Sequence, residues 1–288
     1  MIRFAIATRD ELWLRGRRIE SRLSHGEAIE DEHGIIASDA RDDALVDACA
    51  RELERLRDAA SSIDARVRLV AEARLDGTSA TITIALGGIS IVTTPEHAAQ
   101  DYEMLRAVAK RRADVPSALV AGGTPALPIV WRNGSAALLL HEAIGHAAEH
   151  EHEPIAWPSW LDVDVPLAMR RATFRDVPLR RMTHVVARQH DAPFELPPRR
   201  IEVLLIAGGA YEPLTHEVLL RVAAADLIDG NETRRLAPFD IRATREEIAR
   251  SLTGAEGETI RYPGVVCSRE GQELVVPSAA PVMITVFR

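Results

Sequence analysis

Hydrophobic and polar residues alternate in several short stretches of the first half of the chain. A period of two residues is typical of strands that bury one face. The pattern predicts strands over 3–7, around 12–23, and over 33–36, 67–73 and 80–94. The pair Gly87-Gly88 interrupts the last of these stretches, so we expect a β-hairpin turn there.

Two stretches of the same half show the helical period instead. Between residues 43 and 60, apolar residues recur at helical spacing and charged residues occupy the opposite face, which predicts an amphipathic helix. Cys49 lies on the apolar side of this helix, where a small buried core residue is the expected role, and we assign it no chemistry. A second helix is expected over 97–112.

The β pattern returns after Met182 and continues to the end of the chain. It predicts strands over 183–187, 200–206, 217–227 and 281–287, and a helix over 244–251. Between residues 114 and 128 the chain concentrates Pro, Gly and small residues, as domain boundaries do. We therefore expect an α+β fold with a small α/β N-terminal region, 1–125, and a β-rich region, 126–288.

Composition and charge narrow the class of protein. The chain has 288 residues, of which 47% are hydrophobic, enough to bury a sizeable core. Its formal net charge of −8 argues against nucleic acid or an anionic membrane as a partner, because both need concentrated Lys and Arg. No stretch approaches the roughly 18 apolar residues that span a bilayer, and no signal sequence is evident at the start, so a cytoplasmic location is expected.

Residues 136–146 combine an apolar helical run with three ionisable side chains at its end, His141, Glu142 and His146. Burying two imidazoles and a carboxylate without a partner is costly. Histidines four residues apart share one face of a regular helix, whereas a spacing of five rotates the second by about 140°. This pair can hold one metal ion if the helix contains a π-type bulge or ends there, and Gly145 permits either.

A competing ligand pair follows directly, because His146 and His150 have the i, i+4 spacing of a regular metal-binding helix. A solvated, charged helix end explains the run from His150 to Glu153 more simply. The other histidines without ligand spacing receive no role: His25, His33, His97, His190 and His216.

The segment Leu-Leu-His-Glu-Ala-Ile-Gly-His closely resembles the metal-binding motif of the TldD/PmbA family, whose active members are zinc peptidases. The family's third ligand is a cysteine near the C-terminus followed by a Gly-Gln pair, and Cys267 before Gly271-Gln272 matches this pattern. Further similarity lies at 178–183, 208–215 and 236–239, so the resemblance runs from about residue 129 to the C-terminus. His146 and Cys267 are closer in sequence than we expect for the family, and the N-terminal region is short.

The resemblance implies one zinc ion per chain, held by His141, His146 and Cys267, with Glu142 as the general base. Two imidazoles and a thiolate leave the fourth position of tetrahedral zinc to water, as catalytic sites do, and sulfur favours zinc over magnesium or calcium. Zinc lowers the pKa of water towards about 7, and Glu142 could accept its proton and then protonate the leaving nitrogen of an amide. The expected fold is thus α+β and TldD/PmbA-like, with a β-rich catalytic region that carries the metal-binding helix.

The same resemblance suggests residues that bind substrate. His184 falls in a stretch similar to the family's substrate-side wall, where it could stabilise an oxyanion, although a surface or core histidine fits equally well. Gly208 and Gly209 follow a strongly apolar strand and would let an extended peptide pair with the backbone, with a plain turn as the alternative.

Family members act on unfolded or extended peptides, including leader segments of precursor peptides, as homodimers or as pairs of related subunits. The resemblance therefore implies peptide-bond hydrolysis by a homodimer or by a heterodimer with a homologous subunit. Two alternatives remain open: a zinc amide hydrolase that acts on a small metabolite, and a noncatalytic partner subunit. The presence of Glu142 argues against the second, because a structural site needs no general base. The family has also been described as contacting DNA gyrase, but the sequence shows no concentration of basic residues that would support this role. Substrate and cleavage preference are not readable from the sequence.

Overall fold

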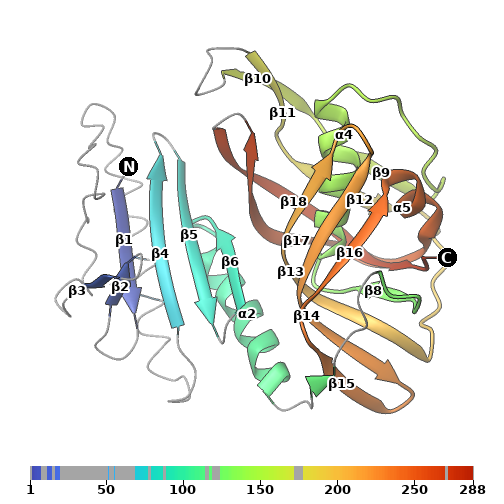
Figure 1. Ribbon diagram of the computed structural model, residues 1–288, viewed down its shortest axis with the longest axis horizontal. Helices are drawn as coiled ribbons and strands as arrows, with labels where there is room; N and C mark the ends of the chain where they lie inside the picture. The colour runs from blue at the N-terminus through green and yellow to red at the C-terminus, as the bar shows by residue number, and fades with distance from the viewer. Residues whose placement is uncertain are drawn as a thin grey trace. The chain divides into compact units, whose positions relative to one another are not determined.

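A computed structural model describes residues 2–7, 12–14, 17–19, 69–76, 79–86, 89–113, 117–118, 124–171, 178–269 and 272–287, together with Arg51 and Arg55. The fold is α+β and rich in strands, as expected, and the chain forms two compact units, Met1–Lys110 and Arg111–Arg288 (Figure 1). The domain boundary expected near residue 125 stays a prediction. Four predictions lie outside the described residues: the strand over 33–36, the role of Cys49, the turn at Gly87-Gly88 and most of the helix over 43–60. Of that helix, Arg51 and Arg55 are described, and both are helical.

The first unit contains a four-stranded antiparallel sheet in the order β1-β4-β5-β6. Its elements are β1 (Ile2–Ala7), β4 (Leu69–Asp76), β5 (Ser79–Leu86) and β6 (Ile89–Thr93), followed by helix α2 (Ala98–Ala113), with β2 (Leu12–Leu14) and β3 (Arg17–Ile19) as a separate hairpin. Alternate residues of β6 are buried, as the period of two predicts. The strands predicted over 3–7, 67–73 and 80–94 and the helix over 97–112 are confirmed; the stretch 12–23 forms two short strands.

The second unit is built on a ten-stranded mixed sheet. The main path runs β7-β15-β14-β13-β8-β18-β12-β9, while β16 pairs with β14 and β17 pairs with β18. The strands are β7 (Ser117–Ala118), β8 (Ile129–Trp131), β9 (Leu161–Asp164), β12 (Val185–Gln189), β13 (Arg199–Glu212), β14 (Glu217–Asp229), β15 (Glu232–Leu236), β16 (Phe239–Thr244), β17 (Leu252–Arg269) and β18 (Gln272–Thr285). A separate hairpin joins β10 (Leu167–Arg171) and β11 (Pro178–Met182), and helix α5 covers Arg245–Ser251.

The predicted strands of this unit are confirmed at β12, β13, β14 and β18, and the predicted helix at α5. The sequence pattern missed the five strands from β7 to β11 and also β15, β16 and β17. In β17 the alternation is broken by irregularities in register between Leu252 and Gly254, between Glu256 and Ile260, and between Tyr262 and Val265. The first and third irregularities each add one residue and so shift the side chains to the other face of the sheet, which leaves no continuous period of two in the sequence.

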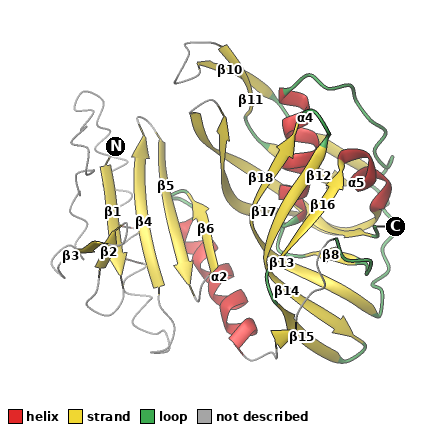
Figure 2. Cartoon of the chain, in the orientation of Figure 1, coloured by secondary structure: helices red, strands yellow, loops and turns green. Residues whose placement is uncertain are grey.

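A largely buried helical segment follows β8. It consists of α3 (Ala136–Leu140), a π-helical turn η2 (His141–Gly145) and α4 (His146–Glu149), and Figure 2 shows it among the strands of the large sheet. Every residue of α3 is fully buried, and α3 contacts β18, β12 and β13. This burial explains the apolar run that precedes His141. No helix in the described part of the chain is long and apolar enough to cross a membrane.

Candidate metal centre

The π turn resolves the five-residue spacing of the two histidines. The extra residue in η2 brings the rings of His141 and His146 to a centroid distance of 5.0 Å, nearly perpendicular to each other. Gly145 lies within this turn, and a Cβ atom there would lie 2.5 Å from the sulfur of Met182 on β11. A larger residue at this position would displace the Met182 side chain, so glycine allows the close packing of the turn on β11. Of the two expected solutions, the bulge is the one observed.

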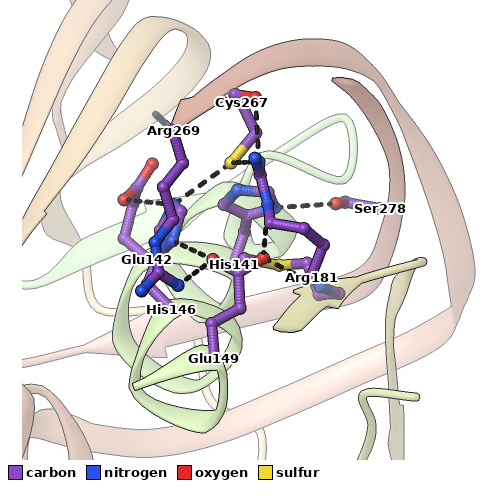
Figure 3. Close-up of polar contacts among 9 residues, drawn as sticks. His141, Glu142, His146, Glu149, Arg181, Cys267, Arg269 and Ser278 are labelled. Carbon is purple, nitrogen blue, oxygen red and sulfur yellow. Dashed lines mark hydrogen bonds and ion pairs between the residues drawn. The ribbon is translucent and has the colours of Figure 1, made fainter. Parts of the chain in front are cut away.

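Cys267 on β17 completes a group of three potential ligands (Figure 3). One nitrogen of His141, one nitrogen of His146 and the sulfur of Cys267 all lie within 4.8 Å of one another. His146 Nε2 and Cys267 Sγ are 3.5 Å apart. In a tetrahedral zinc site with bonds of about 2.0–2.3 Å, ligand atoms are separated by about 3.5 Å. The donor set and its spacing therefore fit zinc.

Glu142 presents an unpartnered carboxylate oxygen beside this group. Its side chain is nearly fully buried, and its Oε2 has no hydrogen-bond partner and lies 3.5 Å from His146 Nε2. Burial raises the pKa of Glu142 to about 7. A carboxyl group with a pKa near neutrality can both accept and release a proton at pH 7, as a general base and acid must.

Strand β13 covers the other side of this carboxylate. A Cβ atom on Gly209 would lie 2.5 Å from Glu142 Oε1, so glycine is required for the carboxylate to keep its place. A Cβ atom on Gly208 would meet nothing within 4 Å. Both glycines lie inside β13 rather than in a turn. Only at Gly209 does the Glu142 carboxylate occupy the space that a side chain would fill.

His141 is held as a neutral ring. Burial, and next to it the neighbouring His146, lower the pKa of His141 to about 3. Its Nδ1 lies 3.5 Å from the hydroxyl oxygen of Ser278 on β18. Neutral imidazole is the form that binds metal, and a partner on one ring nitrogen orients the other.

Glu149 and Arg181 form a buried network behind the ligands that the sequence analysis did not identify. Glu149 Oε2 lies 3.0 Å from His146 Nδ1, and its Oε1 accepts hydrogen bonds from Arg181 Nε at 3.0 Å and from the Met182 backbone N–H at 2.8 Å. Arg181 also donates through one terminal nitrogen to the carbonyl oxygen of Cys267 at 2.9 Å and to its sulfur at 3.1 Å. One signal was available, since Glu149 follows His146 by three residues and so shares its helix face.

This network favours positive charge at His146. Burial disfavours the imidazolium, but the contacts with Cys267 and then Glu149 outweigh it and raise the pKa of His146 to about 10. Burial alone would raise the pKa of Glu149, yet the hydrogen bonds with His146 and the Met182 N–H lower it to about 2. Surroundings that stabilise a proton on His146 also suit a bound cation.

The other histidines proposed from the sequence lie apart from the three ligand atoms. His184 Nε2 lies 3.3 Å from Asp164 Oδ2, and no described contact joins His184 to the candidate centre, so its proposed role stays a prediction. His150 ends α4, and its ring lies 6.2 Å from that of Tyr211 and not with the group of three. The competing pair of His146 and His150 therefore does not form the cluster seen here.

Two solved structures resemble the chain over most of its length. TldE from Thermococcus kodakarensis aligns with 83% of this chain and 74% of its own, at 11% identity and a TM-score of 0.47. A protein from Bacteroides thetaiotaomicron described as a modulator of DNA gyrase aligns with 99% of this chain and 92% of its own, at 12% identity and a TM-score of 0.42. No protein-family model and no curated protein sequence matches the chain.

Proposed function

We propose that the chain is a zinc-dependent peptidase of the TldD/PmbA type that cleaves peptide bonds in unfolded or precursor peptides. The observation that carries this proposal is the buried, unpartnered carboxylate oxygen of Glu142 beside the three convergent ligand atoms. A structural zinc site is closed by four protein ligands and has no use for such a carboxylate. The resemblance of residues 139–146 to the family's metal motif supports the same conclusion.

His141, His146 and Cys267 would hold the zinc ion, which would supply Lewis-acid polarisation of the scissile carbonyl and activation of water. Glu142 would take up the proton of the attacking water at Oε2 and deliver it to the leaving nitrogen. Burial raises the pKa of Glu142 to about 7 in the metal-free site, and a zinc ion bound beside it would lower that pKa and so favour the ionised form that acts as a base. Arg181 and Glu149 would keep Cys267 and His146 in place, as partners of metal ligands commonly do.

The edge of β13 offers a place for an extended peptide. Strand β8 pairs only with Ile201–Val203 of β13, and further along the N–H and carbonyl groups of Ile206 both bond to the hydroxyl of Tyr262. The described strands provide no further partner on this side of β13. We infer that a peptide adds to this edge near Gly208, where the space is open and Glu142 is close by.

The decisive experiment compares zinc content and cleavage of an unfolded peptide library by the wild type, Glu142→Gln and Glu153→Gln. Glu153 is exposed and lies outside the candidate centre, so its substitution is the matched control. We expect about one zinc per chain in all three proteins and cleavage by all except Glu142→Gln. Undiminished cleavage by Glu142→Gln would contradict the proposed mechanism. Turnover of short acyl amides without any cleavage of peptides would favour the small-metabolite alternative.

We also propose that the active form is a dimer, either of two such chains or of this chain and a homologous subunit. This proposal rests on the resemblance to the family alone. Sedimentation of the purified chain, followed by peptide cleavage across the fractions, tests it. Activity that migrates with the monomer would overturn it.

A further inference from the structure

A second group of polar side chains lies next to the candidate metal centre. It consists of His152, Tyr211, His216 and Arg245, and we call it the basic cluster. The ring centroids of His152 and His216 are 4.5 Å apart, and that of Tyr211 lies 5.9 Å from His152 and 6.4 Å from His216. Arg245 begins α5, and its backbone N–H donates to the carbonyl oxygen of His216 at 3.0 Å. Segments far apart in the sequence thus bring these four side chains together.

Each member of the basic cluster contains a buried polar atom without a hydrogen-bond partner. These atoms are His152 Nε2, Tyr211 Oη, His216 Nδ1 and Arg245 Nε, although the hydroxyl of Tyr211 also interacts with the Arg245 side chain inside the cluster. The side chain of Arg245 is the most enclosed, since the residue is only 4% exposed. The carboxylate of Glu246 lies 3.9 Å from His216 Nδ1, which is too far for a hydrogen bond. Buried polar groups in folded proteins are nearly always paired, so three atoms without a hydrogen-bond partner in the protein, on His152, His216 and Arg245, indicate a ligand.

Arg245 gives the cluster a fixed positive charge, and its side chains are rich in donors, while Glu246 is the carboxylate at its margin. Arginine keeps its charge at every physiological pH and has only donors, and the phenol of Tyr211 can also donate. Burial, and then the proximity of His216 and Arg245, lower the pKa of His152. Burial raises the pKa of Tyr211, and Arg245 partly offsets this effect. A guanidinium repels a metal cation but pairs well with the oxygens of a carboxylate, so an anionic ligand fits best.

The position of the cluster connects this ligand with the reaction. The ring of Tyr211 stacks parallel to that of His146, with centroids 6.4 Å apart, so the basic cluster is one side chain away from a proposed zinc ligand. An extended peptide advances about 3.3 Å per residue. A carboxylate held by Arg245 and Tyr211 would therefore lie about two or three residues from the bond that is cleaved.

We propose that the basic cluster binds a carboxylate of the peptide substrate, from an acidic side chain or from the C-terminus, and so selects peptides that carry this charge beside the cleaved bond. The proposal rests on the proposed peptidase function for its biological meaning. Binding of the carboxylate itself requires no catalysis, so it can be measured separately.

The test measures peptide affinity by fluorescence polarisation in the zinc-loaded Glu142→Gln protein, which should bind without cleaving. The probes are labelled alanine-rich peptides with glutamate at each position in turn, matched peptides with glutamine, and versions with a free or an amidated C-terminus. We expect at least one carboxylate peptide to bind about tenfold or more tightly than its amide match, as hydrogen bonds to charged groups allow. Adding Arg245→Gln should abolish this preference, whereas Arg250→Gln, at an exposed position of the same helix, should retain it.

Tyr211→Phe is a second variant, which removes only a hydroxyl group. It keeps the proposal testable if Arg245→Gln does not fold. It should reduce the carboxylate preference several-fold while leaving the affinity for the amide peptides unchanged. Equal affinity for every glutamate and glutamine pair, with no effect of the C-terminal charge, would overturn the proposal, as would a preference that survives both variants. A carboxylate preference together with no cleavage by the parent protein, either alone or with a homologous subunit, would contradict the peptidase function and leave the basic cluster's role intact.

Discussion

Replacing Arg181 with glutamine should weaken zinc binding although it removes no proposed ligand. The guanidinium is fully buried and bonds both to Glu149, which contacts His146, and to the carbonyl and sulfur of Cys267. One side chain therefore positions two of the three ligand atoms. Loss of such a partner commonly lowers metal affinity about 10–100-fold, so we expect the Kd for zinc to rise by that factor.

The same substitution should also destabilise the zinc-free protein. It leaves the carboxylate of Glu149 buried without the cation that lies 3.0 Å from it. Removing one partner of a buried ion pair costs about 3–5 kcal/mol. The loss should lie below that range here, because His146 at 3.0 Å and Arg269 at 3.6 Å still face Glu149 Oε2. A double variant, Arg181→Gln with Glu149→Gln, removes that charge and should recover much of the lost stability.

Zinc affinity is measured by competition with a chromophoric chelator, and the free energy of unfolding by denaturant titration of zinc-free protein. Arg180→Gln is the matched control on the same strand, since Arg180 is 41% exposed and pairs with the exposed Glu151. That change should cost at most about 1 kcal/mol and leave zinc affinity unaltered. A folded Arg181→Gln protein with wild-type zinc affinity would refute the role assigned to the buried network.

Three further outcomes are expected. Gly209→Ala would push a methyl group against Glu142 Oε1 and should lower kcat by about 10²-fold, with zinc content unchanged in elemental analysis; full activity would contradict the assigned position of the carboxylate. Cys267→Ala should lower the zinc content several-fold, and an unaltered stoichiometry would remove Cys267 from the ligand set. Thr285→Val should lower the free energy of unfolding by about 1–3 kcal/mol, because the buried indole N–H of Trp131 would lose its acceptor at 3.0 Å. Denaturant titration measures this free energy, and an unchanged value would mean that the N–H has another partner.

The geometry of the π turn at the candidate centre could be predicted only in part from the local sequence. Two histidines five residues apart, with glycine before the second, limited the possible geometries to a bulge or a helix end. The structure shows the bulge, and the reason lies outside the helix: Gly145 packs against Met182 of β11, which the sequence analysis did not recognise as a strand. The local options were readable, whereas the choice between them was made by tertiary packing.

The sequence by itself determined helices α2 and α5, the strand β13 from its continuous apolar run, and the strand β14 from its alternation. It also indicated the helix of His141, because burial and spacing along one element leave a signature in consecutive residues. The tertiary structure alone decided that Arg181 and Glu149 lie behind the candidate ligands and that Tyr211, His216 and Arg245 gather beside them. These partners come from different strands, turns and helices, and pairing between separate elements leaves no period in the sequence. The order of strands in the large sheet was likewise decided by which apolar faces cover one another, and not by any property of a single strand.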